Sequence, residues 1–124
     1  MIYPFTIHGK MKPYVRMTQK SKFYGQAAEY LASQDAVRVQ LRQQMTANAW
    51  EMLPGQTPLS VSIVIYHKGG LHGRDCDNEM KAILDAMSGI VYPDDRWIDV
   101  LRAERVKDVD DVTFITVLAL DGAL

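Results

Sequence analysis

Closely spaced carboxylates in the second half of this 124-residue chain are the residues best suited to chemistry. Asp75 and Asp77 stand two apart in the segment GRDCDNEMK, and Asp94 and Asp95 form a second acidic pair. Residues two apart point the same way in extended chain, so Asp75 and Asp77 can converge on one cation if the next helix begins only at or after Asp77. Such oxygen ligands suit Mg²⁺, which serves phosphodiester hydrolysis by polarising the phosphoryl oxygen and helping to generate hydroxide.

A lysine follows the first acidic pair at helical spacing. Asp77, Lys81 and Asp85 stand at i, i+4 and i+8, along the flank of the apolar stripe of a predicted helix. The Lys81 ammonium could therefore stabilise charge that develops on a phosphate or a leaving oxygen. A purely structural interpretation stays open. In it, Asp75 or Asp77 caps the helix, and Asp94-Asp95 forms a turn. Asp77, Lys81 and Asp85 are then surface ion pairs worth ~0.3–0.5 kcal/mol per pair.

Two elements are predicted before these acidic residues. Residues 2–8 form a short strand. Residues 26–50 lack Gly and Pro and carry Val37, Leu41 and Met45 on one stripe, which predicts a long helix.

The remaining elements surround the acidic residues. Alternation from Leu59 to Ile65 predicts a strand, and residues 77–88 predict a second helix with Gly89 suited to a left-handed cap. Residues 98–107 and 112–120 predict two more strands, the last apolar enough to lie centrally with both faces covered. The order β-α-β-α-β-β indicates one compact α/β (α+β) domain over residues 1–124, with a mixed sheet of about four strands and two helices. The order of the strands in that sheet does not follow from the sequence.

Charge is polarised along the chain although the net charge is only −1. Residues 1–70 carry eight Lys/Arg and three Asp/Glu, whereas residues 71–124 carry six and twelve. The segment from residue 9 to residue 25 has no acid and mixes basic with aromatic residues, so we expect a loop in which Lys12, Arg16 and Lys20 contact DNA phosphates. A merely solvated surface is the alternative.

The composition also indicates the cellular compartment. Cys76 is the single cysteine, which suits a reducing cytoplasm, and no stretch approaches the ~18 apolar residues of a membrane span. We expect a soluble cytoplasmic protein.

One segment resembles a known family. The pattern Arg74-Asp75-x-Asp77-Asn78-x-x-Lys81-Ala82-x-x-Asp85-Ala86, followed by Asp94-Asp95 and a strand rich in Val and Arg, is similar to the signature of RusA-type crossover junction endodeoxyribonucleases. The close match covers residues 74 to about 106. The resemblance implies a homodimeric Holliday junction resolvase of a bacterial or phage-infected cell, often phage or prophage encoded, that acts in DNA recombination and repair with Mg²⁺ or Mn²⁺.

The resemblance also implies roles for individual residues. The metal ligands would be Asp75, Asp77 and Asp95, the catalytic residue Lys81, the auxiliary residues Asp94, Asn78 and Asp85, and Arg74 a further contact to DNA.

Three other functions remain as alternatives. They are a less selective metal-dependent nuclease on flaps or branched DNA, a DNA-binding module without catalysis, and a phosphotransfer enzyme on nucleotides. The intact acidic and lysine residues oppose lost catalysis, and the absence of a Gly-rich phosphate loop opposes a nucleotide transferase.

Overall fold

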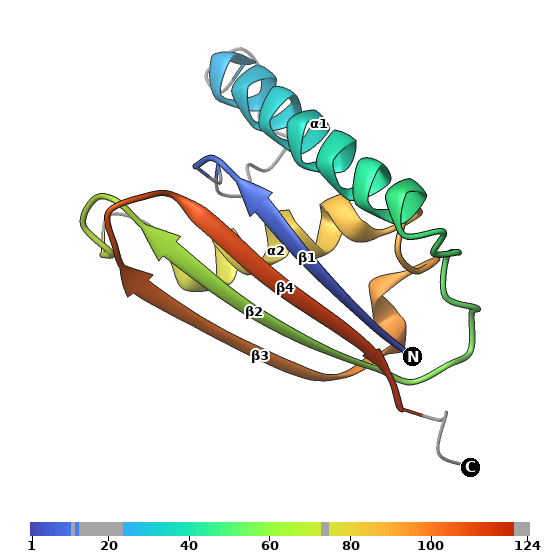
Figure 1. The fold of residues 1–124 in the computed structure, drawn as a ribbon. Helices are drawn as coiled ribbons and strands as arrows, with labels where there is room; N and C mark the ends of the chain where they lie inside the picture. Colours follow the sequence, from blue (N-terminus) through green and yellow to red (C-terminus); the bar gives the residue numbers. More distant parts are fainter. Residues whose placement is uncertain (11, 13–23, 73–74, 121–124) are drawn as a thin grey trace.

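The chain forms a four-stranded sheet with two helices (Figure 1). The computed structural model describes residues 1–10, 12, 24–72 and 75–120. Its elements are β1 (Ile2–His8), α1 (Tyr24–Ala47), β2 (Leu59–His67), α2 (Cys76–Met87), the 3₁₀ helix η2 (Asp95–Trp97), β3 (Ile98–Lys107) and β4 (Val112–Ala119). This order confirms the predicted β-α-β-α-β-β fold, to which η2 is an addition. No helix among the described residues is long and apolar enough to span a membrane.

The strand order in the sheet is β1-β4-β2-β3. β4 pairs antiparallel with both β1 and β2, whereas β2 and β3 are parallel. In register, Ile63 on β2 lies between Ile115 on β4 and Ala103 on β3. A parallel pair needs a crossover connection, and α2 with the segments on either side of it provides one.

The described residues cover only one face of the sheet. On β2, Leu59, Val61, Ile63 and Ile65 are buried, while the residues that alternate with them are half-buried. β4 is central, as predicted, but the expectation that both its faces are covered is wrong, because the Phe114 side chain is 45% exposed. Both helices pack on the same face, so apolar residues on the opposite face of β4 stay in solvent. β3 alternates poorly because it is a largely exposed edge strand.

The long helix α1 packs its predicted stripe inward: Val37, Leu41 and Met45 are all buried. It ends three residues earlier than predicted, because Ala49 takes a positive φ of 54° and the Trp50 N–H donates to the Met45 carbonyl at 2.9 Å.

Two glutamines on α1 complete the free edge of β1. The Thr6 N–H donates to Gln44 Oε1 at 3.0 Å, and the Gln44 amide donates back to the Thr6 carbonyl at 2.8 Å. Gln40 exchanges the same two bonds with His8 at 2.8 and 3.0 Å. These side chains replace the missing neighbouring strand, and they hold α1 against the sheet.

Gly89 follows α2 with a φ of +86°, which confirms the predicted left-handed cap. A Cβ atom added there would meet nothing within 4 Å, so backbone conformation alone would set the cost of a side chain. Gly89→Ala should therefore lower the free energy of unfolding by about 1 kcal/mol, as measured by urea denaturation.

The matched control is Gly69→Ala, where the added Cβ also meets nothing within 4 Å but φ is not positive. This variant should be as stable as the wild type or slightly more stable. Equal losses of stability in the two variants would contradict the assignment of strain to Gly89.

Candidate active site

The parallel crossover places the start of α2 just beyond the end of β2, and Asp75 is its N-cap residue. The backbone of Asp75 is extended (φ −77°, ψ 132°), and its carbonyl accepts the first helical bond, from the Glu79 N–H at 3.2 Å. Its side chain makes no capping hydrogen bond. This observation disfavours the interpretation that Asp75 serves as a helix cap, because the carboxylate is not used for that purpose.

The helix begins one residue too early for the expected geometry of the first acidic pair. It starts at Cys76, so Asp77 already lies in the first helical turn, and its Oδ1 accepts from the N–H of Asn78 at 3.0 Å. The extended-chain argument that Asp75 and Asp77 point the same way therefore does not apply. Both side chains are exposed, and a negative charge at this end of α2 is favourable because it faces the positive end of the helix dipole.

The turn after α2 folds back onto the helix. The N–H of Gly89 donates to the Tyr92 carbonyl at 2.7 Å, and the fully buried Tyr92 donates from its hydroxyl to the Leu84 carbonyl at 3.0 Å. From α1, the Arg38 guanidinium donates to the carbonyls of Asp85 at 3.1 Å and Ala86 at 3.3 Å. Helix-end carbonyls lack partners within the helix, so Arg38 satisfies two of them and ties the end of α2 to α1.

This return brings the second acidic pair against α2. The Asp94 carboxylate caps η2 by accepting from the Arg96 N–H at 2.9 Å. Burial raises the pKa of Asp95, hydrogen bonding to Asp94 and the charges of Asp94 and Asp85 raise it further, and Lys81 lowers it. Burial likewise raises the pKa of the Tyr92 hydroxyl, with the charge of Asp95 adding to the effect. Asp95 thus belongs to a cluster of like charges with one lysine beside it.

The acidic residues fall into two groups along α2. Asp75 and Asp77 lie at its start, whereas the charges that act most strongly on Asp95 come from Asp94, Asp85 and Lys81. Asp77 and Asp85 are eight residues apart, which is about 12 Å along a helix.

The charges of Lys81, Asp85 and Asp94 therefore act on Asp95, but the structure does not group the expected ligands Asp75, Asp77 and Asp95. Within the described residues, no three His, Cys, Asp or Glu side chains are close enough to hold a metal ion. The donor chemistry nevertheless fits a hard divalent cation, because both groups consist of carboxylates.

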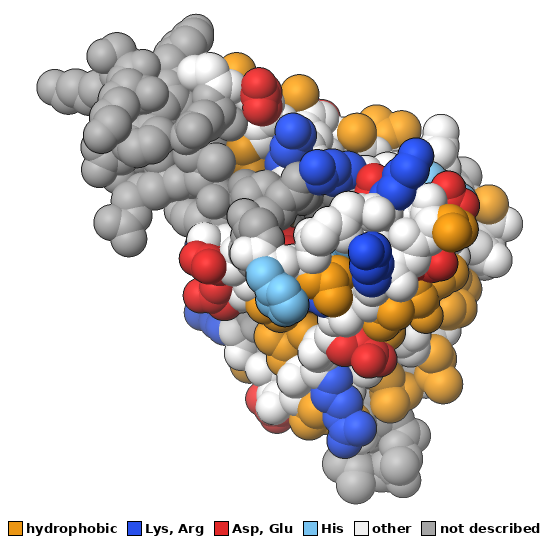
Figure 2. Space-filling model, turned by 90° about the vertical axis from the view of Figure 1, so that its left-hand side faces the viewer, with side chains coloured by type: hydrophobic (Ala, Val, Ile, Leu, Met, Phe, Trp, Pro, Cys, Tyr) orange, Lys and Arg blue, Asp and Glu red, His pale blue; other side chains and the backbone are white. Residues whose placement is uncertain are grey.

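The expected DNA contacts are mostly outside the described residues, where Arg16, Lys20 and Arg74 lie. Lys12 is exposed; its N–H donates to Ser33 Oγ at 3.4 Å, and its ammonium lies 4.0 Å from Glu29. Figure 2 shows Lys/Arg and Asp/Glu side chains interspersed on the drawn face. The separation of basic and acidic residues along the sequence therefore does not produce a surface of one charge there.

Sequence reasoning missed Glu79, whose side chain is fully buried beside His67 and Arg105. A signal was present. Glu79 lies four residues before Ile83 and seven before Ala86, both fully buried, so an acid occupies the apolar stripe of α2.

Together the fold and the site define a class: a small α+β protein that carries carboxylates and a lysine along one helix, a set suited to phosphodiester chemistry. The chain matches the family described as Endodeoxyribonuclease RusA over residues 4–117, nearly its full length, and it belongs to that family. No curated protein matches the chain. The family implies endonuclease activity at Holliday junctions, and RusA nucleases generally depend on a divalent metal.

Proposed function

We propose that this protein resolves four-way DNA junctions by paired symmetric nicks, in recombination and repair, with Mg²⁺ as its natural ion and Mn²⁺ as a substitute. The match to the RusA family over residues 4–117 carries this proposal. The Asp75 carboxylate, which is left free of a capping role, and the charge cluster around Asp95 support it. Its single cysteine fits a reducing cytoplasm in a bacterial or phage-infected cell.

We assign the metal ligands to Asp75, Asp77 and Asp95, as the resemblance implies. A bound divalent cation would polarise the phosphoryl oxygen and lower the pKa of an attacking water. The chain's own residues bind and orient the substrate around that chemistry. The Lys81 ammonium, on the same flank of α2, neutralises charge on the phosphate, while Asn78, Asp85 and Asp94 support the ligands.

We assign the phosphate contacts of the DNA arms to Lys12, Arg16, Lys20 and Arg74. Contacts of this kind hold branched DNA without reading its sequence. Junction binding, measured by fluorescence anisotropy over a range of salt concentrations, tests these contacts. Lys12→Ala should make the negative slope of log affinity against log salt less steep by about one unit per lost phosphate contact.

The carboxylates are tested with a synthetic four-way junction, a flap and a linear duplex, each in Mg²⁺ or EDTA. Wild-type protein should cut the junction in Mg²⁺ and nothing in EDTA. Asp75→Asn, Asp77→Asn and Asp95→Asn should each abolish cleavage while junction binding survives or strengthens, because ligand charge is lost and repulsion of phosphate falls. Gel electrophoresis reports cleavage, and fluorescence anisotropy reports binding.

Asp110→Asn is the matched control, since it removes an exposed carboxylate from the turn between β3 and β4. It should cut normally. Near-normal cleavage by one of the three variants would remove that residue from the metal site, and equal cutting of flap and junction by wild type would favour the less selective nuclease. Loss of cleavage in Asp85→Asn as complete as in Asp95→Asn would move the ion toward the cluster at the end of α2.

Lys81→Ala should slow junction cleavage by roughly 10²–10³-fold, the scale of a lost charge-stabilising donor in a transition state. Lys81 is exposed on the flank of α2, so the fold should survive, which circular dichroism would verify. Single-turnover rates measure the effect. Lys107→Ala, an exposed lysine at the end of β3, should cut at the wild-type rate. If Lys81→Ala cleaves the junction as fast as Lys107→Ala, Lys81 has no catalytic role and is only a surface ion-pair partner.

We further propose that the protein acts as a homodimer, because paired nicks at a junction of two-fold symmetry require two active sites at fixed spacing. The exposed edge strand β3 and the uncovered face of the sheet support an interface there. They expose Val100 (37%), Leu101 (45%) and Phe114 (45%), and the edge of β3 has backbone groups that a second chain could pair with.

Light scattering at micromolar concentration should give twice the 14.0 kDa mass of one chain. Val100→Lys should shift the mass toward that of the monomer. Val109→Lys, at a 76% exposed valine in the turn between β3 and β4, should leave the dimer intact. A monomeric wild-type mass, both free and with junction DNA, would rule out the paired-nick mechanism and leave the less selective nuclease as the better account.

A further inference from the structure

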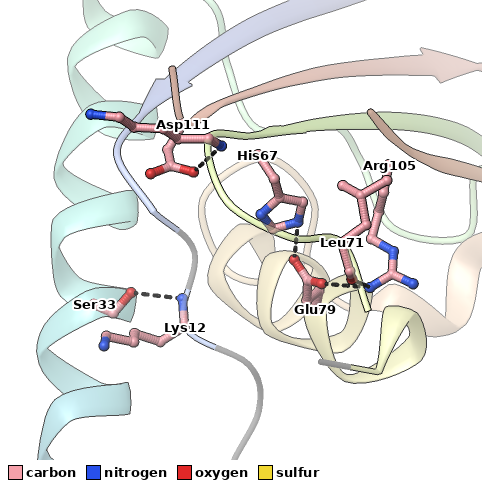
Figure 3. Close-up of polar contacts among 8 residues, drawn as sticks. Lys12, Ser33, His67, Leu71, Glu79, Arg105 and Asp111 are labelled. Carbon is pink, nitrogen blue, oxygen red and sulfur yellow. Dashed lines mark hydrogen bonds and ion pairs between the residues drawn. The ribbon is translucent and has the colours of Figure 1, made fainter. Parts of the chain in front are cut away.

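Glu79 is an acidic residue whose side chain is buried completely. Its side chain is the only Asp, Glu, Lys or Arg among the described residues in the buried class, and its exposure is 0%. Arg105 donates from its guanidinium to Glu79 Oε1 at 3.1 Å. His67 Nε2 lies 2.8 Å from Glu79 Oε2, a close polar contact that is not aligned as a hydrogen bond. Figure 3 shows the three side chains meeting between the sheet and α2.

Stability alone does not account for this cluster. Removing a carboxylate from water costs several kcal/mol, and the attraction of its partners only roughly offsets that cost. Well-packed apolar residues in place of a buried ion pair often leave a protein as stable as before or more stable. The contacts of the cluster instead constrain the geometry of its neighbours.

The cluster joins four parts of the chain. His67 ends β2, Arg105 lies on β3, and Glu79 lies in the first turn of α2. The same Arg105 nitrogen also donates to the Leu71 carbonyl at 2.7 Å, in the segment that leads from β2 to Asp75 (Figure 3). One arginine thus connects the sheet with both the connecting segment and the helix that carries Asp75 and Asp77.

Gly69 and Gly70 follow β2 and carry no side chains that could pack against the sheet or α2. Beside these glycines lies a cavity of about 300 Å³, which is lined by Lys10, His67, Gly69, Gly70, Leu71, Glu79 and Asp111. A Cβ atom at Gly69 or Gly70 would meet nothing within 4 Å. Because the two glycines offer no side-chain packing, the Arg105 bond to the Leu71 carbonyl helps to fix the path of residues 69–71.

Anchoring Glu79 also sets the rotation of α2 about its own axis. Successive residues of a helix are about 100° apart, so Asp77 and Lys81 each lie about 160° around the helix from Glu79. When Glu79 faces the sheet, these two residues must face outward, and both are indeed exposed. A small rotation of the helix would carry them away from their positions.

We propose that His67, Glu79 and Arg105 are positioning residues for the acidic site, holding the backbone at Leu71 and the rotation of α2 so that Asp75 and Asp77 bind a divalent cation. This inference rests on the proposed function, which assigns those carboxylates to the metal. None of the three positioning residues is itself a ligand.

The test measures Mn²⁺ binding to the full chain without DNA, from the electron paramagnetic resonance signal of free Mn²⁺. The triple variant His67→Leu/Glu79→Met/Arg105→Met replaces the whole cluster by apolar side chains. It should unfold at the wild-type temperature or above. Its Kd for Mn²⁺ should nevertheless rise about tenfold or more, the scale seen when groups that orient metal ligands are removed.

Two further variants complete the design. Glu79→Gln keeps the shape of the side chain, but its bonds are neutral and about half as strong, so its Kd should rise by about two- to threefold. Val117→Ala, at a fully buried residue of β4, should lower the unfolding temperature by creating a cavity while leaving the Kd unchanged. Loss of Mn²⁺ binding in Asp77→Asn assigns the measured ion to the acidic site.

A Kd equal to that of the wild type in the folded triple variant would overturn the positioning role. If the triple variant does not fold, an unchanged Kd in Glu79→Gln would overturn it instead. Both results leave the proposed nuclease function intact, because the wild type still binds the ion. Wild-type protein that binds no Mn²⁺ would instead refute the assigned metal site, and with it this inference, whatever the junction assay shows.

Discussion

Parallel pairing of β2 with β3 obliges the chain to travel back along the whole sheet between the two strands, and α2 makes that return. The start of α2 must then lie near the end of β2, and its end near the start of β3. The acidic residues occupy these two places, with Asp75 before the helix and Asp95 before β3. Lys81 lies on the helix between them. The position of the site along the fold is therefore a consequence of one strand pairing.

Holding like charges together requires a scaffold that resists their repulsion. At the end of α2 the scaffold is built from neutral backbone groups. Arg38 binds the last carbonyls of the helix, and Tyr92 fastens the returning turn to Leu84. The carboxylates of Asp94 and Asp95 are left beside Asp85, and the raised pKa of Asp95 reflects in part that crowding. A cation bound beside these carboxylates would reduce the repulsion among them.

The two faces of the sheet serve different purposes. One face is closed by α1 and α2, and it holds the core and the buried Glu79 cluster. The other face remains open, with Phe114 and the edge strand β3 in solvent. We relate the apolar side chains exposed on this face and on β3 to the proposed association of two chains. The edge formed by β1 differs, because Gln44 and Gln40 bond the backbone groups of Thr6 and His8 there.

The sequence by itself determined the elements and the chemistry that they carry. Alternation from Leu59 to Ile65 and the stripe of Val37, Leu41 and Met45 predicted β2 and α1, because side-chain periodicity is a local property. The pattern of acids and Lys81 predicted the family, which the match over residues 4–117 confirmed.

Only the tertiary structure decided the strand order, the open face of β4 and the partners of Asp95. Any strand order satisfies the same alternation, so long-range backbone pairing had to choose among them. The burial of Glu79 likewise depends on His67, twelve residues earlier, and on Arg105, twenty-six residues later. The helix start at Cys76, one residue earlier than the convergence argument for Asp75 and Asp77 required, was also settled by the fold. A carboxylate can stay in the core only where such distant partners converge, and convergence is a property of the folded chain rather than of any segment.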